Sequence, residues 1–262
     1  MPDNLFTVIT VVRNAESLVS GTLHSILDQT YSNFELIIVD GGSTDSTLNK
    51  VNEILSSTSV TTKVISEPDD GIYDAMNKGI KVASGSYTIF INAGDSLCSN
   101  DTLLNVAARV HQNQACDVYF GDSFVSFGEF KNFLKAGKVE NLKFGMQFSH
   151  QAVFVATSLL KQHLFNTNFR IASDFDFLLS LLKYGHSFLY LQMPVAITLH
   201  GGISDAKRLH TYYEYLKIVN QHEFNLKSSS IIALKMFFDL FKKLIKFFIS
   251  PSQLMAIRKF FT

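Results

Sequence analysis

The sequence predicts an α/β fold in which a mixed, mostly parallel sheet is flanked by helices. Two observations lead to this prediction. Short runs rich in β-branched residues recur at 6–12, 34–39, 60–66 and 87–92, and each gap between them is long enough for a helix. Strands joined by such helices form right-handed βαβ units with parallel strands. The length of 262 residues suits one large domain or one domain with an appendage.

The first predicted strand reads FTVITVV, a continuous apolar run typical of a strand that is buried on both faces. Asn14 or Ser17 is placed to cap the helix that follows. The second strand, FELIIV, ends at the glycine turn DGGSTD of residues 40–45, whose Ser and Thr are placed to cap the next helix.

The third strand leads to a helix at 70–83, and the fourth strand follows it. Beyond residue 95 the pattern indicates shorter strands and a hairpin. The remaining elements of this part are predicted as helices at 101–113 and 174–184 and as strands at 117–120, 122–127, 129–134, 151–155, 188–191 and 195–199.

The charge of the chain excludes one class of function. Basic and acidic residues number 23 each, so the basic excess of a dedicated nucleic-acid binder is missing. The charge is uneven, however, because residues 227–262 carry a net +6 and the first 226 residues a net −6. Cys98 and Cys116 form neither a zinc pair nor a disulfide framework, so a reduced cytosolic compartment is expected. We expect no cleaved signal peptide and no spanning helix.

Polar side chains follow each of the four predicted parallel strands. They lie at 10–14, at Asp40, at 67–70 and at 92–95. Ligands of open α/β sheets bind beyond the carboxyl ends of the strands. Any one of these groups could be an ordinary helix cap, but four in succession predict one common site.

The type of ligand follows from what these segments contain. The chain has neither GxGxxG nor GxxxxGK[ST], so phosphate binding by glycine amides alone is not indicated. Carboxylates at a site of this kind favour a divalent cation that bridges them to an anionic diphosphate. Oxygen ligands favour Mg²⁺ or Mn²⁺ over zinc.

Several motifs in a fixed order carry a family resemblance. FTVITVVRN, FELIIVDGGSTDST, ISEPDDGIYDAMNKGI and YTIFINAGDSL cover about the first hundred residues, and HQAVF and IASDFDFLL extend the match to residue 179. In this order they resemble the family 2 glycosyltransferases of the bacterial polysaccharide-assembly type, which have the GT-A fold. The final forty or so residues lie outside the match.

The resemblance implies transfer of a sugar from a nucleotide sugar to a hydroxyl of a lipid-linked or saccharide acceptor in surface polysaccharide biosynthesis. It implies inversion at the anomeric carbon and favours UDP over GDP, and it leaves the sugar, the linkage and the acceptor open. The implied donor-binding residues are Thr10, Val12 and Asp40 at the base, and Asp70, Asn77, Lys78 and Asn92 toward the diphosphate. Asp70 as a helix cap and Lys78 as a solvated helix residue are equally open, and Arg13 could reach a phosphate.

The acidic metal motif of the family falls on Asn92-Ala93-Gly94-Asp95, where only the last acid is present. The resemblance implies that Asp95 binds Mn²⁺ or Mg²⁺, with His200 in LHGGIS as a further ligand. The loss of the first acid puts this metal dependence in question, since an Asn carbonyl supports a hard cation only weakly.

The resemblance also implies that Asp174 is the general base that deprotonates the acceptor hydroxyl. The alternative for Asp174 is an N-terminal helix residue favoured by the helix dipole. Asp176 faces the acceptor or caps the helix. His150 and Gln151 are implied on a loop against the donor sugar or the acceptor.

Two other functions remain open at this stage. A nucleotidyltransferase also places acids beyond such a sheet, but the segment after the first strand lacks its Gly-rich basic loop. A non-catalytic nucleotide-sugar-binding protein is favoured only by the reduced acidic motif.

We predict a GT-A catalytic domain at 1–205 and a helical extension at 206–262. The extension contains helices at 206–223 and 231–249 and, after Pro251, a last short helix. In the second helix the charged residues form one stripe, and the rest of its surface is Ile, Leu, Met and Phe. Such a cationic, Phe-rich helix fits an anionic membrane interface, which predicts a peripheral protein at the inner face of the cytoplasmic membrane. The alternative is a helix packed on the catalytic domain or in a homodimer.

Overall fold

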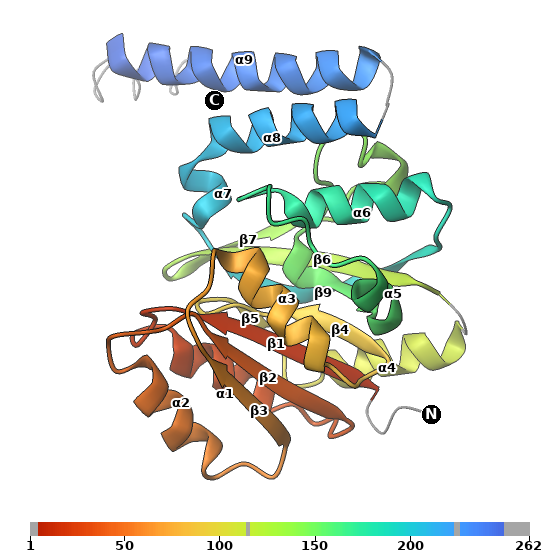
Figure 1. The fold of residues 1–262 in the computed structure, drawn as a ribbon. Helices are drawn as coiled ribbons and strands as arrows, with labels where there is room; N and C mark the ends of the chain where they lie inside the picture. Colours follow the sequence, from red (N-terminus) through yellow and green to blue (C-terminus); the bar gives the residue numbers. More distant parts are fainter. Residues whose placement is uncertain (1–4, 114–115, 223–225, 249–262) are drawn as a thin grey trace.

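A mixed sheet forms the centre of the protein (Figure 1). The computed structural model describes residues 5–113, 116–222 and 226–248. Its strands are β1 Phe6–Val12, β2 Phe34–Asp40, β3 Thr61–Ser66, β4 Tyr87–Phe90, β5 Ser96–Leu97, β6 Val118–Phe127, β7 Phe130–Leu134, β8 Val153–Ala156 and β9 Phe188–Leu199. They lie in the order β3-β2-β1-β4-β8-β6-β9-β5, and β7 pairs with β6.

Helices cover both faces of this sheet. They are α1 Val19–Leu27, α2 Thr47–Leu55, α3 Ile72–Val82, α4 Thr102–Gln112, α5 Thr157–Gln162, α6 Ser173–Lys183, α7 Ile203–Ala206, α8 Arg208–Gln221 and α9 Leu226–Phe248. The helices α1, α2 and α4 contribute to one apolar core, and α3, α5, α6 and α8 contribute to the other. Figure 1 shows α8 and α9 stacked outside α6, at the end of the molecule.

The first half of the sheet confirms the parallel prediction. The strands β3, β2, β1 and β4 are all parallel, with Ile9 opposite Ile37 on one side and Phe90 on the other. Every residue of β1 is buried. Val8 packs into one core and Ile9 into the other, which explains why this strand reads as a continuous apolar run.

The direction of the strands reverses at β8. This strand is antiparallel to both β4 and β6. Its N-terminal end therefore lies at the edge where β4 ends. The short helical turn His150–Ala152 directly precedes β8 and is placed at that edge.

Several boundaries differ from the sequence prediction. The two strands expected at 188–191 and 195–199 are one strand, β9, and those at 117–120 and 122–127 are one strand, β6. The pairing of β6 with β9 shifts register where Asp122 lies opposite Pro194. Proline has no N–H to give to the ladder, so the pairing is irregular there and the sequence pattern is interrupted. The short elements β5, α5 and α7 were not predicted.

The predicted helix caps are also wrong. Asn14 adopts a positive φ of 47° and accepts a hydrogen bond from Thr44 N–H, and α1 begins only at Val19. Ser43 accepts from the Asn14 N–H. The polar residues of these two turns therefore bind each other across the sheet edge. The last helix expected after Pro251 lies outside the described residues, and the domain division at residue 205 stays a prediction.

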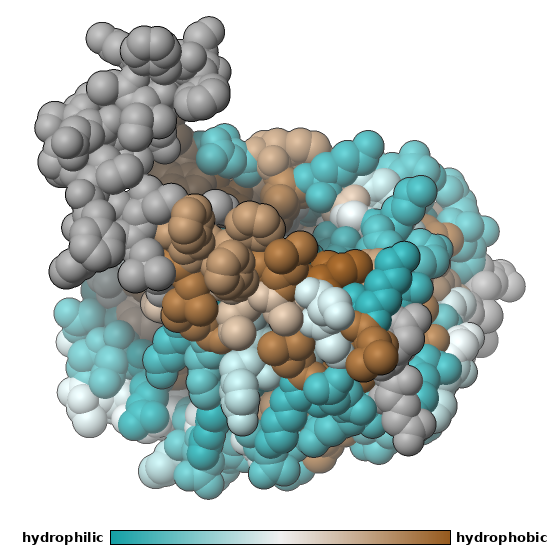
Figure 2. Space-filling view, turned by 90° about the horizontal axis from the view of Figure 1, so that it is seen from above, coloured by the Kyte–Doolittle hydropathy of each residue, from teal (hydrophilic) through white to brown (hydrophobic). Residues whose placement is uncertain are grey.

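Two charged residues of helix α9 contact the body of the protein. Lys235 Nζ donates to the Phe144 carbonyl at 2.8 Å, and Asp239 pairs with Arg208 at 2.8 Å. The outward stripe is apolar and consists of Leu234, Phe237, Phe238 and Phe241, each at least half exposed. Figure 2, which looks down on this end of the molecule, shows apolar surface gathered there and bordered by hydrophilic residues. Within the described residues, no helix combines the length and the apolar character that crossing a membrane requires.

One buried carboxylate ties the parallel strands together. Glu35 on β2 is 1% exposed and accepts hydrogen bonds from Thr7 Oγ1 at 2.7 Å, Ser84 Oγ at 2.8 Å and Gly85 N–H at 3.2 Å. Lys63 on β3 lies 3.4 Å away. Burial raises the pKa of Glu35, but these hydrogen bonds and the Lys63 charge outweigh burial and hold its pKa below the ordinary value.

We expect the substitution Glu35→Gln to lower the free energy of unfolding near neutral pH by about 1–3 kcal/mol, because the new amide turns a donor toward existing donors. The folded pKa lies below the ordinary value of 4.5. The Glu35 carboxylate therefore contributes fully to the free energy of unfolding above pH 4.5, and this contribution is lost as the pH falls through the pKa of the folded state. Urea unfolding near neutral pH and in mild acid will show whether the gap between the two proteins narrows in acid.

The control is Glu53→Gln on α2, where the glutamate is exposed. It should leave stability almost unchanged at both pH values. A similar loss in both variants, or no loss for Glu35→Gln, would contradict the role given to Glu35.

Candidate functional site

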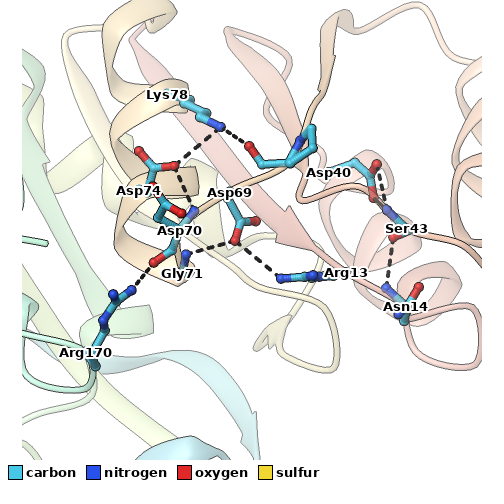
Figure 3. A network of polar contacts seen from close by, with 11 residues as sticks. Arg13, Asn14, Asp40, Ser43, Asp69, Asp70, Gly71, Asp74, Lys78 and Arg170 are labelled. Carbon is cyan, nitrogen blue, oxygen red and sulfur yellow. Dashed lines mark hydrogen bonds and ion pairs between the residues drawn. The ribbon is translucent and has the colours of Figure 1, made fainter.

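Four strand-end segments meet at one edge of the sheet, as the sequence predicts. Gly41 N–H donates to the Val12 carbonyl at 3.0 Å, Glu67 N–H donates to the Asp40 carbonyl at 3.1 Å, and Ala93 N–H donates to the Val11 carbonyl at 3.2 Å. These bonds continue the strand pairing past the ends of β1, β2, β3 and β4. Figure 3 shows the polar network that the first three segments form.

Asp40 is fully buried and holds the turn that follows β2. Its carboxylate accepts from Ser43 N–H at 3.1 Å (Figure 3). It also accepts from Ser66 Oγ at 2.8 Å. Within the described residues, the hydrogen-bond partners of its side chain belong to this turn and to β3. The structure thus gives Asp40 a structural role, and its contact with a nucleotide base stays a prediction.

Asp69 approaches this turn closely at Gly41. A Cβ at Gly41 would lie 1.8 Å from Asp69 Oδ2, so a larger residue here would displace the Asp69 carboxylate. Asp69 accepts from Gly71 N–H at 3.0 Å and lies 3.8 Å from the exposed guanidinium of Arg13 (Figure 3). The sequence motif contains Asp69, but nothing in its local pattern distinguished it from Asp70.

Asp70 and Lys78 lie in the same network at the start of α3. The side chain of Asp70 is exposed, and its carbonyl accepts a hydrogen bond from Arg170 (Figure 3). Lys78 Nζ donates to the Pro68 carbonyl at 2.6 Å and pairs with Glu67 at 3.0 Å. Burial lowers the pKa of Lys78, but its acidic neighbours outweigh burial and raise the pKa above its ordinary value. Its ammonium group is therefore charged and held beside the segment that follows β3.

Asn77 lies elsewhere. It is buried, and its amide pairs with the backbone of Phe165 in both directions at 2.9 Å. The predicted contact of Asn77 with the diphosphate is therefore not supported, because both of its polar atoms bind the loop after α5.

The turn after β4 contains Asp95, the one acid of the metal motif Asn92-Ala93-Gly94-Asp95. Gly94 has a φ of +98°, which glycine adopts easily, and Asp95 N–H donates to the Asn92 carbonyl at 2.9 Å. The Asp95 carboxylate accepts from Leu199 N–H at 3.0 Å and from Gln151 Nε2 at 2.8 Å. Burial raises the pKa of Asp95, although these hydrogen bonds oppose the shift.

Asp174 lies in the first turn of α6 and is nearly buried. Its Oδ1 accepts from Tyr73 Oη at 2.8 Å and from Phe175 N–H at 2.9 Å, and its Oδ2 lies 3.1 Å from His150 Nδ1. Burial raises the pKa of Asp174, but His150 and Tyr73 outweigh burial and keep the pKa below its ordinary value. Burial lowers the pKa of His150, and Asp174 and Asp95 together raise it above the usual value.

His150 and Gln151 join the two acids singled out in the sequence. His150 contacts Asp174, and the adjacent Gln151 donates to Asp95. Both residues lie in the turn before β8, which the antiparallel pairing with β4 brings to this edge. The structure therefore places Asp95, Asp174 and the 150–151 turn in one connected site.

Several buried polar atoms near this edge have no hydrogen-bond partner within the described part of the chain. They are Thr10 Oγ1, Asn92 Oδ1, His150 Nε2 and Ser173 Oγ. Buried polar atoms without partners are rare in folded proteins and often mark functional sites. Thr10, Asn92 and His150 are residues that the sequence singled out, and Ser173 precedes Asp174.

Two predicted site residues point elsewhere. Asp176 Oδ1 lies 2.7 Å from His222 Nε2, so Asp176 binds α8 and not the acceptor side of the site. The His200 ring lies 4.3 Å from the Phe127 ring, on the β6–β7 hairpin. Among residues 5–113, 116–222 and 226–248, no group of three or more His, Cys, Asp or Glu side chains is arranged to hold a metal ion. The role of His200 as a metal ligand beside Asp95 therefore stays a prediction.

Sequence comparison places the chain among known proteins. Residues 7–192 match the family model described as Glycosyl transferase family 2. A PGL/p-HBAD biosynthesis glycosyltransferase of Mycobacterium bovis is 34% identical over 174 residues, which cover 66% of this chain and 68% of the relative. The UDP-Glc:alpha-D-GlcNAc-diphosphoundecaprenol beta-1,3-glucosyltransferase WfgD of Escherichia coli is 33% identical over 113 residues, which cover 43% of this chain and 44% of that protein.

Solved structures share the fold. S. aureus TarS 1–349 in complex with UDP-GlcNAc has a TM-score of 0.69 at 19% identity. The match covers 89% of this chain and 72% of the TarS chain. The mannosyltransferase PcManGT from Pyrobaculum calidifontis, in complex with GDP-Man and Mn²⁺, has a TM-score of 0.67 at 15% identity. The match covers 89% of this chain and 69% of the PcManGT chain. The predicted GT-A fold is confirmed. Because the family match spans well over half of the chain, this protein belongs to the family 2 glycosyltransferases.

Proposed function

We propose that this glycosyltransferase transfers a sugar from a UDP-sugar to a hydroxyl of a lipid-linked or saccharide acceptor, with inversion at the anomeric carbon. The observation that carries the proposal is the Asp174 carboxylate. It is nearly buried, it stays ionised because its pKa is lowered, and His150 and Gln151 connect it to the turn after β4.

Asp174 acts as the general base. Its Oδ1 lies within hydrogen-bond distance of two donors, Tyr73 Oη and Phe175 N–H, whereas Oδ2 faces one, His150 Nδ1. Oδ2 therefore retains a lone pair for the acceptor hydroxyl. The proton moves from this hydroxyl to Asp174 as the acceptor oxygen forms its bond to the anomeric carbon. The bond from that carbon to the diphosphate oxygen breaks, and the nucleoside diphosphate leaves.

A divalent cation fits the turn after β4. The Asp95 carboxylate and the unpartnered Asn92 Oδ1 are hard oxygen ligands, and the diphosphate and water would complete the shell of Mn²⁺ or Mg²⁺. When bound, the ion supplies Lewis-acid stabilisation of the negative charge on the leaving group. The Mn²⁺ in the PcManGT structure supports this proposal.

UDP is the proposed nucleotide. The name of the E. coli relative contains UDP-Glc, and the TarS structure contains UDP-GlcNAc. The unpartnered Thr10 Oγ1 supports a contact near the end of β1, where Val12 and Asp40 also lie. A screen of UDP- and GDP-sugars that reads released nucleoside diphosphate will identify the donor.

We further propose that α9 lies on an anionic membrane that presents the acceptor, in surface polysaccharide assembly at the inner face of the cytoplasmic membrane. The outward stripe of Leu234, Phe237, Phe238 and Phe241 exposes apolar area that a membrane interface would bury. The name of WfgD includes a diphosphoundecaprenol acceptor, which supports a lipid-linked acceptor for this chain.

We expect Asp174→Asn to fold normally and to lose turnover by about 10²–10⁴-fold, since the amide cannot take the proton. The measurement is release of nucleoside diphosphate with the best donor of the screen. Asp176→Asn is the matched control, because Asp176 lies on the same helix but binds His222. Near-normal turnover of Asp174→Asn would remove Asp174 as the base.

We expect Asp95→Asn to weaken Mn²⁺-dependent binding of UDP by about tenfold or more, because a ligand charge is lost. Titration calorimetry of UDP with and without Mn²⁺ measures this effect. Glu53→Gln on the exposed face of α2 serves as the charge control and should bind normally. Equal Mn²⁺ dependence in wild type and Asp95→Asn would refute the metal role.

We expect the double substitution Phe237→Ser and Phe241→Ser to reduce co-sedimentation with vesicles that contain about one-third anionic phospholipid. The reason is that two of the four apolar side chains that the membrane would bury are lost. The matched control is Leu104→Ser with Phe130→Ser, which removes exposed apolar side chains elsewhere on the surface. Unchanged sedimentation of the α9 variant, or an equal decrease in the control, would argue against the membrane contact.

A further inference from the structure

A buried glutamate on α8 binds the segment that leads into Asp174. Glu214 is 4% exposed, and it lies forty residues after Asp174 in the sequence. Its Oε1 accepts from Arg170 N–H at 2.9 Å, and its Oε2 accepts from Ile171 N–H at 3.0 Å and from Ala172 N–H at 2.8 Å. One carboxylate thus binds three consecutive backbone N–H groups directly before α6.

This contact is coupled to the proposed base through Tyr73. The Tyr73 hydroxyl lies within hydrogen-bond distance of both the Ile171 carbonyl, at 2.6 Å, and Asp174 Oδ1, at 2.8 Å. Both of these atoms are acceptors, so the single hydroxyl proton of Tyr73 serves one of them at a time. Ile171 is therefore held by Glu214 through its N–H, and its carbonyl lies beside the hydroxyl that also contacts Asp174. A shift of this segment would move both the Tyr73 contact and the start of α6, which carries Asp174.

A second link between α6 and α8 is independent of this segment. His222, the residue that follows α8, lies with its Nε2 2.7 Å from Asp176 Oδ1. It joins α6 to the end of α8, and within the described residues His222 itself has no hydrogen bond to residues 170–172. A substitution of His222 therefore serves as a control, because it weakens the packing of α8 on α6 but leaves the Glu214 contact in place.

We propose that Glu214 is a positioning residue, which holds the backbone of residues 170–172 so that the Asp174 carboxylate points at the acceptor hydroxyl. This inference rests on the proposed role of Asp174 as the base. Glu214 does not touch the substrate. It acts on the orientation of Asp174, and a displacement of about 1 Å in such a group can lower the rate by about 10²-fold.

The test compares Glu214→Gln and Glu214→Ala with His222→Gln in the full-length protein. Glu214→Gln keeps the size of the side chain but turns an NH₂ group toward at least one of the backbone N–H groups of residues 170–172. This variant carries the test if Glu214→Ala does not fold. Amide hydrogen exchange reports on residues 170–172. Turnover is measured with UDP-glucose, UDP-GlcNAc and GDP-mannose, and binding of UDP is measured by calorimetry.

We expect the Glu214 variants to exchange faster at 170–172 and to lose about 10–100-fold in kcat, with unchanged KM for the donor and unchanged UDP binding. His222→Gln should lower thermal stability but leave kcat and the exchange at 170–172 close to wild type. Normal kcat in both Glu214 variants, or an equal loss of kcat in His222→Gln, would overturn the proposal. Failure of the base assignment itself is distinguished by Asp174→Asn, which would then retain its turnover.

Discussion

A carboxylate in a protein interior remains ionised only if hydrogen bonds and opposite charge replace the water it has lost, and the site of this enzyme depends on that condition at Asp174. The partners are Tyr73 from α3, His150 from the turn before β8, and the start of α6 itself. Three segments far apart in the chain must therefore assemble before Asp174 can take its proposed role as a base. The position of α6 is as much a part of the site as its aspartate.

The reversal of strand direction makes this assembly possible. Four parallel strands bring their carboxyl ends to one edge, and the antiparallel β8 adds its N-terminal end at the same edge. His150 and Gln151 consequently lie between Asp174 and Asp95. A purely parallel sheet would place the turn before β8 at the opposite edge. The change of direction thus connects the proposed base to the turn that is proposed to hold the cation.

The outer helices connect this site to the surface. Helix α8 binds the α6 region through Glu214 and His222, and α9 turns Lys235 and Asp239 inward and its Phe-rich stripe outward. The stripe proposed to meet the membrane and the helix that carries the proposed base are therefore joined through α8.

The sequence by itself determined the parallel half of the sheet, the GT-A fold and the motifs that contain Asp95 and Asp174, because strand periodicity, turn residues and ordered motifs are local properties of the chain. The tertiary structure alone decided the partners. It paired Asn77 with Phe165 and Asp176 with His222, and it placed the His200 ring beside the Phe127 ring. It also directed Lys235 and Asp239 of α9 toward the body of the protein. Glu214 had no local signal at all. Each of these contacts joins segments distant in sequence, and such contacts depend on how helices and strands pack, which no pattern within one segment records.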